Sequence, residues 1–242
     1  MTRMLVGLVA LLLSSNAWAA GGVAVLYFQN EGNVALEPLK VGLAQMLVTD
    51  LTTDSDLPII ERSQLQAALD EFKLGHDGIA DPVSAARVGK LVGAQYFVMG
   101  TYFELFGTLR IDTRIVEVET GRIVFAYGTN SPTSAFLTME KDVSAALRSK
   151  LDSLQLPKAK TPSGTRSTEG ASVVAPPAAT AVASTTVVTT ERHTLDAAVA
   201  YSEGLIHLDQ RDLPRAREAF EKAVAADPQL EAARAELSQM TL

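Results

Sequence analysis

The chain has 242 residues, of which 47% are hydrophobic and 20% are charged, a composition that excludes a wholly disordered chain and a polytopic membrane protein. The formal net charge of −7 argues against a surface for nucleic acid, because such surfaces gather Lys and Arg. No cysteine is present, so disulfides, thiolate metal sites, cysteine nucleophiles and a lipid-modified cysteine are not expected.

The first nineteen residues have the pattern of an export signal. Arg3 gives a positive start, residues 5–13 form an apolar run, and small residues precede a cleavage point between Ala19 and Ala20. The apolar run is too short to span a bilayer. We expect residues 1–19 to be removed and the mature protein to be periplasmic, with association with the outer membrane through partners left open.

The next part of the chain alternates strand-like and helix-like patterns. Residues 23–28 form an apolar and aromatic run that predicts a buried strand. Apolar residues at spacings of three and four over residues 36–51 predict an amphipathic helix. A second short strand is expected at residues 57–60, and Ser63 with Gln66 fits a capping box that opens another helix.

A further helix and two long strands are predicted beyond a loop. Residues 81–82 supply an Asp N-cap and a proline at the first helical position, and Gly93 is expected to end this helix. Residues 95–106 and 108–119 then predict two strands joined at Gly107.

The last part of this region completes the predicted sheet. The apolar face of the second long strand changes sides at Ile115 and Val116, which predicts a bulge. A third strand is expected at residues 122–129. Residues 131–132 (Ser-Pro) are expected to cap a last helix that ends near Leu154.

These elements define four segments. Residues 1–19 are the predicted signal peptide, and residues 20–155 form a predicted α/β domain with a mixed sheet that ends in an antiparallel meander, flanked by helices. Residues 156–192 are rich in Pro, Ala, Thr, Ser and Val and predict a disordered linker, since small side chains cannot offset the entropy of ordering. Residues 193–242 return to a helical pattern.

The helical segment has the spacing of one tetratricopeptide-like repeat, in which small residues let two antiparallel helices approach and a Phe fills the gap. The residues that carry this predicted packing are Gly204, Ala216, Phe220, Ala223 and Pro228. Asp227 and Pro228 are expected to start a third, capping helix. One repeat is fewer than the three normally needed for stability, so this segment could dimerise, dock on the first domain or fold only with a partner.

The sequence predicts no catalytic, cofactor-binding or metal-binding residues. His76, His193 and His207 are not spaced as metal ligands, and the nucleophile-elbow, phosphate-loop and dinucleotide glycine patterns are missing from the chain. Glu117 and Glu119 lie near arginines of the predicted meander. We expect a solvated sheet face with cross-strand ion pairs there rather than a pair of catalytic carboxylates.

Four segments in chain order carry a resemblance to a known family. They are residues 23–26 (VAVL), 59–63 (IIERS), 91–101 (LVGAQYFVMGT) and 115–124 (IVEVETGRIV). In this order the chain resembles the curli assembly/transport component (CsgG) family over residues 22–155. The resemblance implies an α/β domain of nucleotide-binding-like topology, used as a protein–protein assembly module without enzymatic activity.

The same general fold occurs in a flagellar outer-membrane-associated family and in lipoprotein activators of peptidoglycan synthases. From the export signal, the resemblance and the helical repeat, we expect a non-catalytic periplasmic adaptor or accessory factor in envelope assembly or secretion. Its partners would be other envelope proteins rather than nucleic acid, and self-association is left open. The alternatives are an oligomeric outer-membrane secretion channel component of the curli type and an activator of a cell-wall enzyme.

Overall fold

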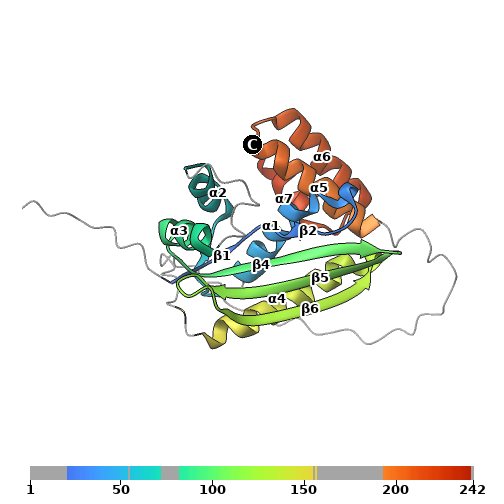
Figure 1. Ribbon diagram of the computed structural model, residues 1–242. Coiled ribbons are helices and arrows are strands. Elements are labelled where there is room, and N and C mark those ends of the chain that lie inside the picture. Colours follow the sequence, from blue (N-terminus) through green and yellow to red (C-terminus); the bar gives the residue numbers. More distant parts are fainter. Residues whose placement is uncertain (1–20, 54, 72–81, 155, 157–192, 241–242) are drawn as a thin grey trace, which may run out of the picture.

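The computed structural model describes residues 21–53, 55–71, 82–154, 156 and 193–240 (Figure 1). Six strands form one sheet. The strands are β1 (Gly22–Val25), β2 (Gln29–Asn30), β3 (Ile59–Ile60), β4 (Ala94–Leu105), β5 (Thr108–Glu117) and β6 (Ile123–Pro132). The helices are α1 (Leu39–Thr52), α2 (Arg62–Glu71), α3 (Pro82–Val92), α4 (Phe136–Ser153), α5 (His193–Asp209), α6 (Leu213–Ala226) and α7 (Glu231–Gln239), with short 3-10 turns η1 (Val34–Leu36) and η3 (Thr133–Ala135).

The sheet is mixed, as the sequence predicts. Its strand order is β3-β1-β4-β5-β6, and β2 pairs with β4. β1 runs parallel to β3 and β4, whereas β4, β5 and β6 form an antiparallel meander. The turn between β4 and β5 has positive φ at Phe106 (52°) and Gly107 (77°), the backbone that a two-residue hairpin turn requires.

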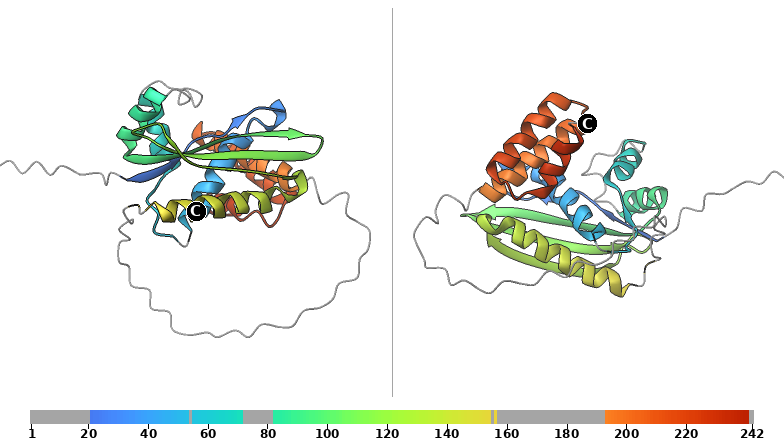
Figure 2. Two further views of the ribbon diagram at one scale, coloured as in Figure 1. Left: turned by 60° about the horizontal axis from the view of Figure 1, so that its bottom comes forward. Right: turned by 180° about the vertical axis from the view of Figure 1, so that it is seen from behind.

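One face of the sheet is covered by α1 and α4, and the other by α2 and α3 (Figure 2). α1 is buried more completely than an amphipathic surface helix. Nine of its fourteen residues are buried, and residues 41–44 are all among them, so burial extends around the helix axis. An amphipathic helix would expose the side of α1 that turns away from the sheet. This prediction is wrong, because a second layer of helices covers that side.

That second layer is the C-terminal segment. α5 packs on α1 at a close approach, since a Cβ on Gly42 would overlap the Ser202 hydroxyl. Buried residues of α5, α6 and α7 join those of the sheet, α1 and α4 in one hydrophobic cluster. Of the three outcomes that the sequence left open for this segment, the structure shows docking on the α/β domain. Among the described residues, no helix is both long and apolar enough to cross a membrane.

Two predicted features are confirmed, and several predicted strand ends are wrong. β5 ends at Glu117 rather than at residue 119, and β6 continues to Pro132 rather than ending at residue 129. The register shifts between Ile115 and Val116 as predicted, although the extra residue is Val124 on β6. Gly93 ends α3 with φ 73°, as predicted. The first strand, however, ends at Val25, because the chain changes register before β2 pairs farther along β4. The second begins at Ile59 rather than two residues earlier.

Three predicted helix starts are also wrong. α2 begins at Arg62, so Ser63 lies within its first turn rather than at the N-cap. The Ser-Pro pair at 131–132 is the end of β6, because β5 extends to Thr108 and keeps this segment in the ladder. α7 begins at Glu231, because Asp227 accepts a hydrogen bond from the Gln229 N–H at 2.8 Å and forms a turn.

Candidate functional site

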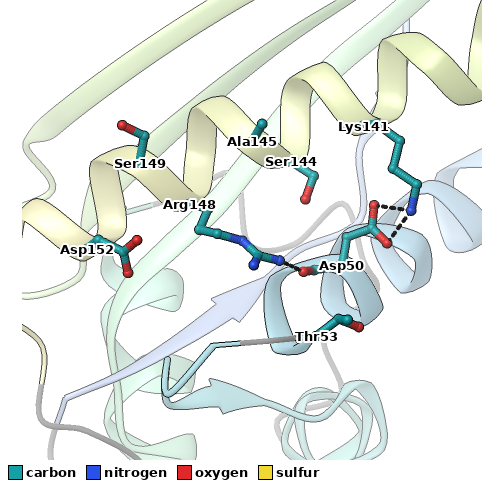
Figure 3. Close-up of a pocket in the computed structure, with 8 residues that line it drawn as sticks. All are labelled: Asp50, Thr53, Lys141, Ser144, Ala145, Arg148, Ser149 and Asp152. Atoms are coloured by element: carbon teal, nitrogen blue, oxygen red, sulfur yellow. Dashed lines mark hydrogen bonds and ion pairs between the residues drawn. The ribbon is translucent and has the colours of Figure 1, made fainter. Parts of the chain in front are cut away.

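A cleft of about 610 Å³ lies between the C-terminal end of α1 and the exposed side of α4 (Figure 3). Its lining includes side chains of both charge signs and several hydroxyl groups. The residues that line it are Asp50, Thr53, Lys141, Ser144, Ala145, Arg148, Ser149 and Asp152. Side chains from α4 reach across the cleft and donate hydrogen bonds to Asp50 of α1, so they link the two helices (Figure 3).

Three of the charged residues of the cleft interact with one another. Lys141 Nζ donates to both carboxylate oxygens of Asp50, at 2.6 and 2.7 Å. Arg148 donates to the main-chain oxygen of Asp50, which is one of the terminal carbonyls of α1 and favours a cation there. Burial lowers the pKa of Lys141, but the hydrogen bonds to Asp50 outweigh it and raise that pKa overall. Lys141 is therefore a charged, bound ammonium group and not a nucleophile.

Glu140 lies beside this cleft, within the core. Only 1% of its surface is exposed, and one of its carboxyl oxygens has no hydrogen-bond partner in the described part of the chain. Burial, and secondly the neighbouring Asp50, raises the pKa of Glu140 to about 8. This environment therefore favours the neutral, protonated form of the Glu140 carboxyl group.

Sequence reasoning missed Glu140, although the helix pattern contains the evidence. Phe136, Met139, Val143 and Leu147 form the apolar stripe that buries α4. Glu140 occupies a position of the same stripe, where a charged side chain is rarely found without a partner. A carboxylate at a core position of an amphipathic helix was thus the one indication of an unusual site.

A second polar network joins the α/β domain to the C-terminal helices. Arg62 donates to both carboxylate oxygens of Asp209, one of them at 2.9 Å, from the first residue of α2 to the last residue of α5. The same guanidinium donates to Tyr27 Oη at 3.1 Å and to Gln45 Oε1 at 3.2 Å. Although burial opposes it, the pairing with Asp209 raises the pKa of Arg62. Arg62, the arginine of the IIERS segment, thus links α2 to α5 within the chain.

The position of this network within the sheet is significant. The strand order reverses at β1, since β3 lies on one side of it and β4 on the other. Open α/β sheets bind ligands outside the carboxyl ends of the strands at such a point. Here Tyr27 and Arg62, which follow β1 and β3, are bridged to Asp209 of α5. The end of α5 is thus bonded to residues in the region where open α/β sheets commonly bind ligands.

The residues predicted for repeat packing meet at the α5–α6 contact. Gly204 lies against the ring of Phe220, where a Cβ would overlap the ring atoms. Ala216, Phe220 and Ala223 are buried, whereas Pro228 is exposed in the turn before α7. These positions do not form a cleft together. The predicted cleavage residues Ala19 and Ala20 lie outside the described residues.

The remaining candidates stay apart from both polar clusters. Glu117 pairs with Arg122 at 3.6 Å across the turn between β5 and β6, and Glu119 is exposed. His207 lies on α5, and its Nδ1 is buried without a hydrogen-bond partner in the described part of the chain. His76 lies outside the described residues. Within those residues, no cluster of three or more His, Cys, Asp or Glu could hold a metal ion.

The cleft can bind polar groups through several hydrogen bonds. Ser144, Ser149 and Thr53 contribute hydroxyl groups, and no histidine is among the lining residues to activate one of them. Lys141 and Arg148 are already held by Asp50. The arrangement suits recognition of a polar, mixed-charge surface.

Part of the chain matches a family model. Residues 14–105 match the model described as "Curli production assembly/transport component CsgG". The match runs through β1, α1, α2 and α3 to the end of β4, and it confirms the resemblance predicted from the sequence over this part of the chain. The tetratricopeptide-like interpretation of α5 and α6 stays a prediction. A search among curated proteins found no match.

Three solved bacterial structures are partly similar to this chain. The C-terminal domain of LpoB from Escherichia coli is 20% identical, with a TM-score of 0.40 over 49% of this chain and 88% of that one. Lipoprotein GNA1162 from Neisseria meningitidis is 16% identical, with a TM-score of 0.42 over 56% of this chain and 99% of that one. The dodecamer of a PelC variant from Paraburkholderia phytofirmans is 13% identical, with a TM-score of 0.33 over 55% of this chain and 90% of that one.

Proposed function

We propose that this protein is a non-catalytic accessory factor of the bacterial cell envelope, which acts in assembly or secretion by binding other proteins. The observation that carries the proposal is the match of residues 14–105 to a curli assembly/transport component, because these residues build the parallel half of the sheet and three of its helices. The export pattern that ends at Ala19 supports a periplasmic location.

Two features of the structure support binding over catalysis. The position where an open α/β sheet would hold a small ligand is occupied by the Arg62–Asp209 bridge to α5. In the cleft between α1 and α4, both basic side chains are already bound to Asp50, and hydroxyl groups lie beside them. The rims of protein–protein interfaces are polar and contain such groups. The cleft therefore suits contact with a folded partner or an extended polypeptide.

The cleft gives a direct test of this function. Ala145 is exposed and lines the cleft, so Ala145→Trp would fill it without disturbing the core. Thr138 is exposed on the same helix and is not among the lining residues, so Thr138→Trp is a matched control. The tagged full chain would be crosslinked in the periplasm of its host and purified.

We expect envelope proteins to be captured by the unmodified chain and by Thr138→Trp, and to be lost with Ala145→Trp. Capture that is equal in all three would remove the cleft from the proposal. A chain that captures nothing and stays in the cytoplasmic fraction would contradict the accessory role itself. Oligomers that require detergent would favour the channel component, and capture of a peptidoglycan synthase would favour the activator.

A further inference from the structure

The two edges of the sheet are built differently. One edge is β3, with only two residues, and a strand this short offers little backbone for pairing. The other edge is β6, with ten residues (Figures 1 and 2). None of these ten residues is fully buried, and within the described residues no strand pairs with the outer side of β6. A long unpaired strand is a template for another strand.

β6 lacks protection along its centre. Its sequence, IVFAYGTNSP, contains no charged residue, although 20% of the whole chain is charged. Natural edge strands are commonly guarded by a lysine, a proline or a bulge. In β6 the bulge is at Val124 and the proline is at Pro132, at the two ends. The unguarded run 125–131 is centred on Gly128.

We propose that β6 pairs with β6 of a second copy of this chain, antiparallel, about a two-fold axis at Gly128. The backbone register favours this axis. The Tyr127 carbonyl accepts a hydrogen bond from Thr113 Oγ1 at 3.2 Å, so Tyr127 turns its backbone groups toward β5. In an antiparallel strand the alternate residues then turn N–H and C=O outward. These are Ala126, Gly128 and Asn130, which would pair as 126 with 130′ and 128 with 128′.

The side chains of β6 complement themselves about the same axis. On the face toward α4, Tyr127 would lie opposite Thr129 and Phe125 opposite Ser131 of the second copy, so each aromatic ring meets a small hydroxyl residue. On the other face, Ala126 would lie opposite Asn130. The bulge at Val124 would meet Pro132, which leaves the seven residues between them free to pair.

Electrostatics do not oppose this seam. The net charge of −7 disfavours contact between most surfaces of two copies, but β6 contributes no charge. On β5, Arg110 and Asp112 form a bidentate pair at 2.7 Å. This pair lies over Gly128, where a Cβ would overlap the Asp112 carboxylate, so its two charges neutralise each other beside the axis. Pairing of this edge is independent of the accessory role proposed above.

The absence of cysteine in the chain permits a test that is specific to the register. In hydrogen-bonded antiparallel pairs the Cα atoms are about 5.5 Å apart, which a disulfide can bridge. Residue 126 would lie next to 130′ but, at about 3.4 Å per residue, far from 126′. We expect the double variant Ala126→Cys/Asn130→Cys to form a covalent dimer on mild oxidation. Each single variant should stay monomeric on a non-reducing gel.

A second variant tests the pairing without crosslinking. Because the Asn130 N–H faces outward, Asn130→Pro leaves the ladder to β5 intact and blocks the new one. Sedimentation of the unmodified chain should show a dimer, and Asn130→Pro should raise its dissociation constant by at least about tenfold at unchanged circular dichroism. Single cysteine variants that crosslink as well as the double variant would overturn the proposal. So would a chain that is monomeric and does not crosslink, an outcome that leaves the edge to a segment of another protein.

Discussion

The two faces of the sheet are covered by helices of different origin. α2 and α3 cover one face over β1, β3 and β4 with a small hydrophobic cluster, and they come from residues adjacent in the chain. The other face is covered by α1 and α4, and α1 is in turn covered by α5, which begins at His193, far along the chain from the end of α4 at Ser153. The larger core therefore depends on a segment outside the part that matches the family model.

The C-terminal helices are part of the larger core. They are not a separate module attached to a finished domain, because Leu195, Tyr201 and Leu205 of α5 are buried in the same cluster as α1. Removing them would expose the all-round apolar surface of α1. The face covered by α2 and α3 would lose nothing directly.

The largest expected effect follows from removing the second layer. A chain that ends at Leu154 should lose several buried side-chain contacts at about 1–2 kcal/mol each, so on the order of 5 kcal/mol of stability. We expect it to aggregate or to unfold far below the full chain in a thermal melt. A chain that lacks only residues 241–242 is the control. Equal unfolding midpoints for the truncated and full chains would show that the two faces are independent.

The next effect concerns the tie between α2 and α5. Asp209→Ala would leave the Arg62 guanidinium, whose side chain is only 13% exposed, with neutral partners alone. We expect a loss of about 2–4 kcal/mol in urea unfolding. Glu218→Ala, at an exposed position of α6, is the control and should change little. If the losses of stability in Arg62→Met and Asp209→Ala simply add in the double variant, the two side chains are not coupled. The bridge would then not stabilise the contact between α2 and α5.

A smaller effect is expected where α1 and α5 approach most closely. A Cβ on Gly42 would overlap the Ser202 hydroxyl, so Gly42→Ala should cost about 1–3 kcal/mol in spite of its better helix propensity. Ser202→Ala removes the overlapping oxygen. The double variant should therefore be more stable than Gly42→Ala alone. The absence of this recovery would show that the overlap is relieved elsewhere.

Much of the fold could be predicted from the sequence, because its patterns are local. The order of elements, the bulge near Ile115 and the helix end at Gly93 all follow from alternation, spacing and turn residues. Docking of α5 could not be predicted in the same way, since it is a contact between distant segments. The periodic leucines of α1 predict one buried face. The residues buried on its second face do not follow that period, so the sequence pattern does not reveal the contact with α5.

The candidate site was harder to predict than the fold. Asp50 and Lys141 lie 91 positions apart in sequence and meet only because α1 and α4 cover the same face of the sheet. Their types and spacing resemble ordinary surface charges. Arg62 was visible in the IIERS segment, but its partner Asp209 lies 147 positions away on a helix whose location the sequence left open.

The last expected effect is a dependence of stability on pH, and it would distinguish the α4 side of the large core from the rest of it. Burial, followed by Asp50, raises the pKa of Glu140 from 4.5 to about 8. Between these pH values the folded chain keeps this proton while the unfolded chain releases it. The contribution of Glu140 to stability is therefore greatest at low pH and is lost as the pH rises through this window.

Glu140→Gln removes this titration and keeps the shape of the side chain. We expect the variant to gain about 1 kcal/mol relative to the unmodified chain for each pH unit between pH 5 and pH 8, as measured by thermal melts across that range. Glu218→Gln, at an exposed position, should follow the unmodified chain at every pH. Parallel curves for Glu140→Gln and the unmodified chain would mean that Glu140 is ionised in the fold. The ammonium of Lys141, rather than a proton, would then balance the two carboxylates of Asp50 and Glu140.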